Sequence, residues 1–171
     1  AMPSAVLMLL FEEEEKWSFF LMERSNNVEY HRGQISLPGG SQEKGENLER
    51  TALREANEEI GIVPASVHML GEITPLFIPA SGFRVHPFVG WSEMVPKVTI
   101  DSNEVAELHK VKVENLLDDS RMKQEQREIR GFNVNVPYFH LNQLKVWGAT
   151  AAILSECKDI FSKCYSMENT Q

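Results

Sequence analysis

The chain has 171 residues, with 25 Asp and Glu against 17 Lys and Arg, and carries a formal net charge of −8. Its length corresponds to about one domain and its composition, 42% apolar and 25% charged, is that of a folded protein, so we expect a single domain over residues 1–171. The acidic balance argues against nucleic acid and anionic membranes as partners, because the excess of Lys and Arg that neutralises phosphates is missing. A small phosphorylated substrate stays open.

The sequence also argues against a membrane span and a disulfide framework. The longest apolar run, residues 5–11, is too short to cross a membrane and lacks the basic start of a secretory signal. Cys157 and Cys164 lie in a segment with helical periodicity, roughly 10 Å apart along the axis, and cannot bridge. Reduced thiols favour a cytoplasmic location. Because Ala1 precedes Met2 and a strand pattern follows at once, we expect the natural chain to have further N-terminal residues.

The chain begins with a predicted β-hairpin. Apolar runs at residues 6–11 and 17–22 flank a charged loop at residues 12–16, which is typical of two strands joined by a solvated turn. A strand-like piece at residues 34–37 follows. It ends at residues 38–40, where the sequence Pro-Gly-Gly is a strong breaker of regular structure.

Residues 47–60 predict a helix. Asn47 can cap its start, Gly61 suits its end, and Pro64 follows just beyond. The apolar side chains recur every four residues and form one stripe, which would face a core. The stripe consists of Leu48, Ala52, Ala56 and Ile60.

The second half of the chain is punctuated by Gly, Pro, Ser and Asn. We expect strands at residues 67–70, 85–91, 105–113 and 134–139, a short polar helix at 115–126 and a closing amphipathic helix at 149–164. The predicted buried face of the last helix comprises Ile153, Leu154, Cys157, Ile160, Phe161 and Cys164. Strands mixed with a few helices in one chain indicate an α/β fold, a sandwich of a mixed sheet between helices.

Three carboxylates gather on the predicted helix at 47–60. Glu55, Glu58 and Glu59 are spaced i, i+3 and i+4, so they share one face and repel one another. Arg54 offsets only part of this repulsion, whereas a hard divalent cation would turn it into affinity. The turn at residues 39–40 lets the backbone approach the same place. An ordinary exposed helix with Glu–Arg pairs would show the same spacing, so the spacing alone leaves both interpretations open.

The surrounding pattern is more specific. Residues 39–62 read GGSQEKGENLERTALREANEEIGI. From Gly40 the spacing is five residues, Glu46, seven residues and then REANEEIGI, which begins at Arg54. This segment resembles the signature of Nudix hydrolases at each defining position of residues 40–62, with Ala56 and Ile62 in the two hydrophobic positions. The resemblance implies a Nudix-like α/β/α sandwich and a hydrolase that uses Mg²⁺ or Mn²⁺ to cleave a nucleoside diphosphate linked to another group.

The resemblance also implies roles for individual residues. Glu55, Glu58 and Glu59 would be metal ligands, with the carbonyl of Gly39 assisting. Glu55 has an alternative role as the base that activates water. The same resemblance leaves these two roles of Glu55 open.

Further roles follow from the same resemblance. Arg54 would orient the carboxylates as part of the catalytic set, and Glu46 would steady the loop against the helix. Nudix enzymes often draw another glutamate from a distant loop, and residues 101–107 are the obvious source here. Glu104 is the first candidate for this ligand or base and Glu107 the second, although a solvated loop acid would look the same in sequence.

Segments outside this motif indicate which branch of the family the chain resembles. Residues 21–25 (LMERS), 31–40 (HRGQISLPGG), 81–90 (SGFRVHPFVG) and 147–150 (WGAT) together look like the coenzyme A pyrophosphatase branch of the Nudix family. This implies cleavage of CoA or acyl-CoA to 4′-phosphopantetheine and adenosine 3′,5′-bisphosphate. The candidates for substrate binding are Arg24, His31, Arg32, Ser36 and Phe83, the last of which would stack on an adenine.

The chain departs from this branch at two places, and other functions stay open. Glu29 stands where the branch has a basic residue, and Leu37 stands where it has Phe; Arg32 or Arg24 would have to replace the missing charge. ADP-ribose, nucleotide sugars and damaged nucleotides are alternative substrates. A Nudix-fold binding module without turnover is a third alternative, which has no need of the full carboxylate set. The sequence leaves open whether the chain is a monomer or a homodimer.

Overall fold

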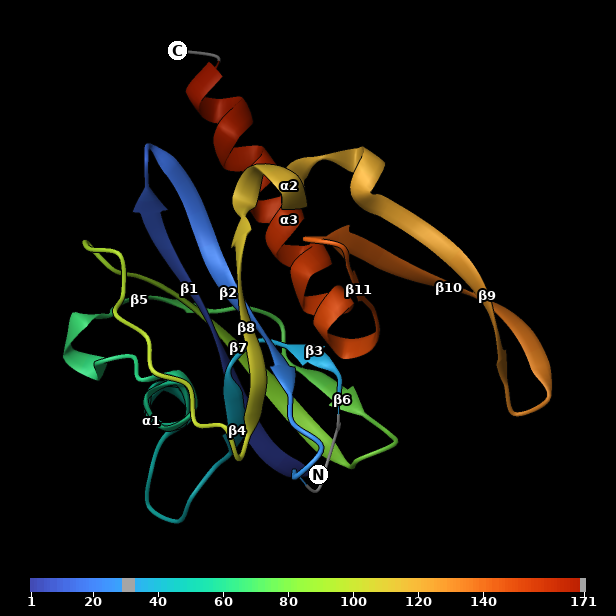
Figure 1. Ribbon diagram of the computed structural model, residues 1–171, viewed down its shortest axis with the longest axis horizontal. Coiled ribbons are helices and arrows are strands. Elements are labelled where there is room, and N and C mark those ends of the chain that lie inside the picture. The colour runs from blue at the N-terminus through green and yellow to red at the C-terminus, as the bar shows by residue number, and fades with distance from the viewer. Residues whose placement is uncertain (29–32, 170–171) are drawn as a thin grey trace.

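The computed structural model describes residues 1–28 and 33–169 (Figure 1). Within them, a mixed sheet is built from β1 (Met2–Glu13), β2 (Lys16–Arg24), β3 (Ile35–Ser36), β4 (Gly39–Ser41), β5 (His68–Glu72), β6 (Leu76–Ile78), β7 (Phe83–Trp91) and β8 (Val105–Lys112). The main order is β3-β2-β1-β7-β5, with β4 beside β1, β6 beside β7 and β8 beside β2. The β1 and β7 strands run parallel, and the other pairs run antiparallel.

Helices cover both faces of this sheet, as the sequence predicts (Figure 1). One face packs against α1 (Leu48–Ile60), and the other packs against α2 (Val113–Leu117) and α3 (Gly148–Asn169). Alternation along β1 explains the two layers, because Leu7 and Leu9 join the core under α1, whereas Met8 joins the core under α3. The expected α/β/α sandwich is confirmed.

The ends of α1 lie where the sequence predicts them. The side chain of Asn47 accepts a hydrogen bond from the Arg50 N–H at 2.8 Å and so caps the first turn. Gly61 ends the helix with φ at +77°, a left-handed conformation that glycine adopts without a Cβ clash. A single 3₁₀ turn (Pro64–Ser66) leads from there to β5.

The predicted helix at residues 115–126 is confirmed only at residues 115–117, and beyond Leu117 it is wrong. The α2 helix stops at Leu117, a 3₁₀ turn spans Asp119–Arg121, and a hairpin of β9 (Met122–Ile129) and β10 (Phe132–Leu141) follows. A two-residue turn with positive φ at Arg130 and Gly131 closes the hairpin, and β9 pairs with β10 over the whole length of β9. Pairing with β10 overrides the helical propensity of the Lys, Gln and Glu residues in this segment. A short β11 (Leu144–Val146) completes this second sheet beside β10.

The closing helix is longer than predicted, and its buried face is shorter. Ile153, Leu154 and Cys157 are buried, whereas Ile160 and Cys164 are exposed. Figure 1 shows why, because the last turns of α3 extend beyond the edge of the sheet. Both cysteines are free thiols, as predicted. Among the described helices, none combines the length and apolar character needed to cross a membrane.

Candidate metal and substrate site

Three carboxylates converge beside Gly39 and Gly40 of β4. Glu55 and Glu59 come from α1 and Glu104 from the loop before β8, and their oxygens lie within 4.8 Å of one another. The Glu59 side chain is fully buried. Its Oε1 accepts a hydrogen bond from the Gly39 N–H at 2.7 Å, and its Oε2 lies 3.6 Å from Nη1 of Arg24 and has no hydrogen bond. We call Glu55, Glu59 and Glu104 the acidic cluster.

The pairing of β2 with β8 explains why Glu104 lies in the acidic cluster. The register of β2 and β8 shifts between Glu23 and Arg24, so the chain bulges at the point where β8 begins. The Ser25 N–H then donates to the Glu104 carbonyl at 2.9 Å, and the Asp101 N–H donates to the Glu59 carbonyl at 2.9 Å. The loop is therefore tied both to β2 and to the end of α1.

Glu104, and not Glu107, joins the cluster. Glu107 lies on β8 beside Glu23 and His109, which form a separate group of possible ligands on the strands. Sequence alone ranks the two glutamates only weakly, because the bulge that decides between them has no clear signal in the residues.

Glu58 lies outside the acidic cluster. Its side chain is 49% exposed and its carboxylate lies 3.3 Å from Nη1 of Arg54. Helical spacing places Glu55, Glu58 and Glu59 within one turn of α1. The sheet covers only part of that turn, so Glu59 faces β4 and is buried, whereas Glu58 faces solvent. The three predicted ligands on α1 are thus divided in the described structure.

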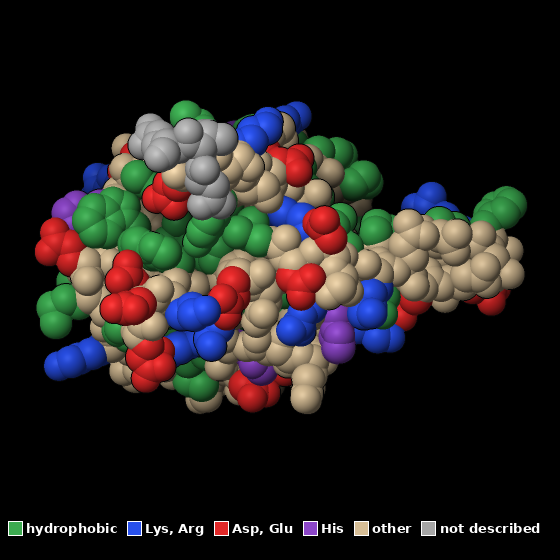
Figure 2. Space-filling model, turned by 90° about the horizontal axis from the view of Figure 1, so that it is seen from above, with side chains coloured by type: hydrophobic (Ala, Val, Ile, Leu, Met, Phe, Trp, Pro, Cys, Tyr) green, Lys and Arg blue, Asp and Glu red, His purple; other side chains and the backbone are tan. Residues whose placement is uncertain are grey.

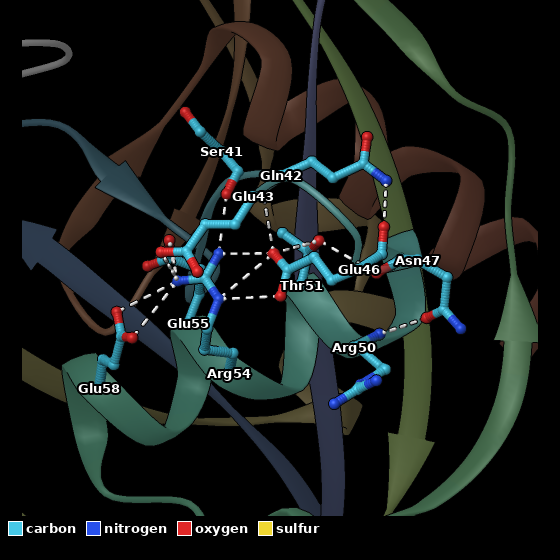
Figure 3. A network of polar contacts seen from close by, with 10 residues as sticks. All are labelled: Ser41, Gln42, Glu43, Glu46, Asn47, Arg50, Thr51, Arg54, Glu55 and Glu58. Carbon is cyan, nitrogen blue, oxygen red and sulfur yellow. Dashed lines mark hydrogen bonds and ion pairs between the residues drawn. The ribbon is translucent and has the colours of Figure 1, made fainter.

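Arg54 is the centre of a polar network that joins the loop to α1 (Figure 3). Its guanidinium donates to Glu46 at 2.8 Å and 3.0 Å, to the Ser41 carbonyl at 2.8 Å and to Glu55 at 3.0 Å. The hydrogen bonds from Arg54 hold the pKa of Glu46 at about 2, and Thr51 donates to the same carboxylate. Arg54 thus contacts both the loop and the Glu55 carboxylate, and Glu46 joins the loop to α1 through Arg54 and Thr51.

The two glycines before this loop allow close contacts. A Cβ on Gly40 would lie 2.5 Å from the carboxyl carbon of Glu55, and one on Gly39 would lie 2.3 Å from the Ala5 carbonyl. Any larger residue at these positions would displace the carboxylate or the β1–β4 pairing. The turn expected at residues 39–40 is wrong, since both glycines lie in β4 and pair with β1. The site requires them because these close contacts leave no room for a side chain.

The cluster is electrostatically unfavourable without a counter-charge. Burial raises the pKa of Glu59 to about 8, helped by the nearby Glu55 and Glu104 charges and opposed by the Gly39 N–H and Arg24. Burial also raises the pKa of Glu55. A buried carboxylate oxygen without a hydrogen bond, in a set made only of oxygen donors, fits a hard divalent cation.

A cavity of about 350 Å³ adjoins the acidic cluster. Three predicted substrate-binding residues, Arg24, Ser36 and Phe83, line it, and Trp147 closes another side. The cavity shares Arg24, Gly39 and Ser41 with a trough that contains Glu55 and Glu104. Most of the other walls are apolar and include Ile78, Val85 and Ile153.

Two predicted substrate-binding residues, His31 and Arg32, lie outside the described residues, as does Glu29. Trp147 is a cavity residue that the predicted site lacks. The sequence feature that could have identified it is the segment at residues 147–150. That segment contributes to the branch resemblance, but the resemblance assigns no role to the Trp147 side chain.

Comparison with known proteins identifies the family. The family model described as the NUDIX domain matches residues 1–130. The chain belongs to the Nudix hydrolase family. A relative in Yersinia enterocolitica, named "Uncharacterized Nudix hydrolase NudL", is 37% identical over 80% of this chain and 70% of its own length. "Nudix hydrolase 15, mitochondrial" of Arabidopsis thaliana is 33% identical over 88% of this chain and 55% of its own length.

Solved Nudix structures share the fold. A Nudix hydrolase from M. smegmatis, RenU, superposes with a TM-score of 0.68 over 95% of this chain and 86% of its own, at 14% identity. A C. elegans Ap4A hydrolase, solved as a binary complex, superposes with a TM-score of 0.59 over 68% of this chain and 84% of its own, at 21% identity. At these identities the Nudix superpositions establish the fold alone. The predicted family, fold and enzyme class are confirmed.

Proposed function

We propose that this Nudix hydrolase cleaves the pyrophosphate of CoA or acyl-CoA to 4′-phosphopantetheine and adenosine 3′,5′-bisphosphate. One observation carries the proposal. The segments that resemble the CoA pyrophosphatase branch are distant in sequence, yet Arg24 of β2, Ser36 of β3, Phe83 of β7 and Trp147 before α3 line one cavity beside the acidic cluster. We take residues 1–171 as one Nudix domain that acts in the cytoplasm.

Glu55, Glu59 and Glu104 are the residues that would hold Mg²⁺ or Mn²⁺, with the Gly39 carbonyl and Glu58 as further candidates. When bound, such a cation neutralises charge on the phosphate oxygens and increases the acidity of water. The Glu59 side chain is fully buried and its Oε1 accepts from the Gly39 N–H, so Glu55 and Glu104 are the better candidates to take the proton of the attacking water.

The substrate anion needs a cation from the protein, and Arg24 is the described residue placed to supply it. Its side chain is 18% exposed, lines both the cavity and the trough, and has a buried Nε without a hydrogen-bond partner. A phosphate oxygen would satisfy that donor. Phe83 and the apolar walls would then contact the uncharged parts of the substrate.

The proposal is tested by product analysis over a panel of substrates. With Mg²⁺ or Mn²⁺ and CoA, we expect adenosine 3′,5′-bisphosphate and 4′-phosphopantetheine in equal amounts, with CoA turned over faster than ADP-ribose, a nucleotide sugar or a nucleoside triphosphate. Faster turnover of ADP-ribose under the same conditions would overturn the CoA assignment. Metal-dependent cleavage of none of them would favour a binding module.

A further inference from the structure

The β9–β10 hairpin forms an arm beside the Nudix core. Figures 1 and 2 show it projecting from the body, and Figure 2 shows hydrophobic side chains at its end. Ile129, Phe132 and Val134 are 45%, 74% and 41% exposed, respectively. In the second sheet β9 is a terminal strand, and in the described part of the chain it pairs with β10 alone. One edge of β9 therefore offers free backbone donors and acceptors.

The arm has one apolar face and one polar face. Residues directly opposite in an antiparallel pair share a face, so Ile129 lies beside Phe132 and Arg127 beside Val134. The same face continues as Glu125 beside Val136 and Lys123 beside Tyr138, and we call it the apolar face of the arm. The opposite face carries Gln124, Gln126, Glu128, Asn133 and Asn135. An exposed edge with a half-exposed apolar face is a surface that a further strand would cover.

We propose that two copies of the chain associate through antiparallel pairing of their β9 strands about a two-fold axis. Such an axis, perpendicular to the sheet, places each residue opposite one from the same face, so the register must be centred on a residue. The two apolar faces then become continuous across the dimer.

The charges on β9 select the register. Centring on Glu125 would oppose Glu125 to its own copy and Lys123 to Arg127, which sets like charges face to face. Centring on Gln126 pairs residues 123–129 with their copies, opposes Glu125 to Arg127 twice and places the two Gln126 side chains together. This register has no like charges directly opposite, and it pairs more of β9 than a register centred on Gln124, which joins only residues 122–126. The complementary charges favour a second copy as the occupant of the edge.

Within one chain, Glu125 accepts hydrogen bonds from Arg127 and Lys145 at 2.7 Å each, and Arg127 stacks over Trp147 at 4.1 Å. A single charge change therefore disturbs contacts inside the arm as well as across the proposed interface. The test therefore needs variants in which the contacts within each arm stay broken while the charge pairing between the two copies is restored.

Charge exchange supplies that design. We expect the wild-type chain to show twice its 19.5 kDa mass in light scattering at micromolar concentration. Glu125→Arg alone and Arg127→Glu alone should each return the mass to one chain, because each homodimer would oppose like charges. An equimolar mixture of the two variants should regain the double mass, since each copy then supplies the charge that the other lacks.

A wild-type chain that stays at the mass of one copy up to millimolar concentration overturns the proposal. So does a dimer that both single variants leave intact, because another surface would then hold it. A mixture that remains monomeric, when each variant alone is folded by circular dichroism, also contradicts the proposed register.

The position of the axis has its own test in a Cys164→Ser background. Gln126→Cys should form a disulfide between copies on mild oxidation, because the two side chains face each other. Gln124→Cys, two residues along the same face, should not cross-link. Equal cross-linking of both variants would overturn the register.

Discussion

Glu59→Gln is expected to abolish metal-dependent hydrolysis, with a loss of more than about a hundredfold, because substitutions that only support a metal ligand already cost about 10–100-fold. The change removes one charge from the acidic cluster and keeps the side-chain volume and the carbonyl that accepts from Gly39. Turnover of CoA with Mg²⁺ or Mn²⁺ is the measurement. Glu49→Gln, in the exposed first turn of the same helix, is the matched control and should leave turnover unchanged. Turnover of Glu59→Gln at the wild-type rate would refute the role of Glu59.

The same variant should behave differently in the absence of metal. Glu59 has a pKa of about 8 in the folded chain and 4.5 as its ordinary value, so the folded state keeps a proton that the unfolded state has released. The free energy of unfolding then falls as the pH rises from about 4.5 to about 8. Glu59→Gln lacks this titration, so its melting temperature relative to the wild type should rise over that range. Added Mg²⁺ should stabilise the wild type and not the variant.

Arg54→Ala is expected to destabilise the fold by about 2–4 kcal/mol, because Glu46 and Glu55 would be left half-buried without their charged partner. Chemical denaturation is the measurement. Glu46 contributes through a lowered pKa, so the loss should be complete above pH 4.5, its ordinary value, and shrink as the pH falls toward about 2.

Two substitutions serve as controls for Arg54→Ala. Arg50→Ala changes an exposed residue one turn earlier, whose side chain is not joined to the network in Figure 3, and should shift stability by less than about 0.5 kcal/mol. Arg54→Lys keeps the charge but not the forked donors, so its stability should lie between those of Arg54→Ala and the wild type. Equal stability of Arg54→Ala and Arg50→Ala would contradict the network's role.

The loop and helix of the site could be predicted from sequence because short-range contacts determine them. The cap at Asn47, the left-handed end at Gly61 and the contacts of Arg54 with Glu46 and Glu55 all join residues that are close in the chain, at most eight positions apart. The expected mixed sheet between helices follows from the alternation of apolar residues along the strands.

Features set by tertiary contacts were not accessible in this way. The choice of Glu104 over Glu107 depends on the bulge between β2 and β8, and the separation of Glu58 from Glu59 depends on what covers α1. Residues 122–126, at the start of the arm, read as a helix because they favour one, whereas residues 134–139 of β10 read as a strand. Only pairing with β10 makes β9 a strand.

The cation site is tested most directly by titrating Mn²⁺ into the protein and following the relaxation of water protons. Glu104→Gln should weaken Mn²⁺ binding at least about tenfold, because it removes one ligand from the acidic cluster. Glu107→Gln, three residues further along, should bind Mn²⁺ within about twofold of the wild type, since Glu107 lies with Glu23 and His109 instead. Unchanged binding in Glu104→Gln, or an equal loss in Glu107→Gln, would contradict the site described for Glu55, Glu59 and Glu104.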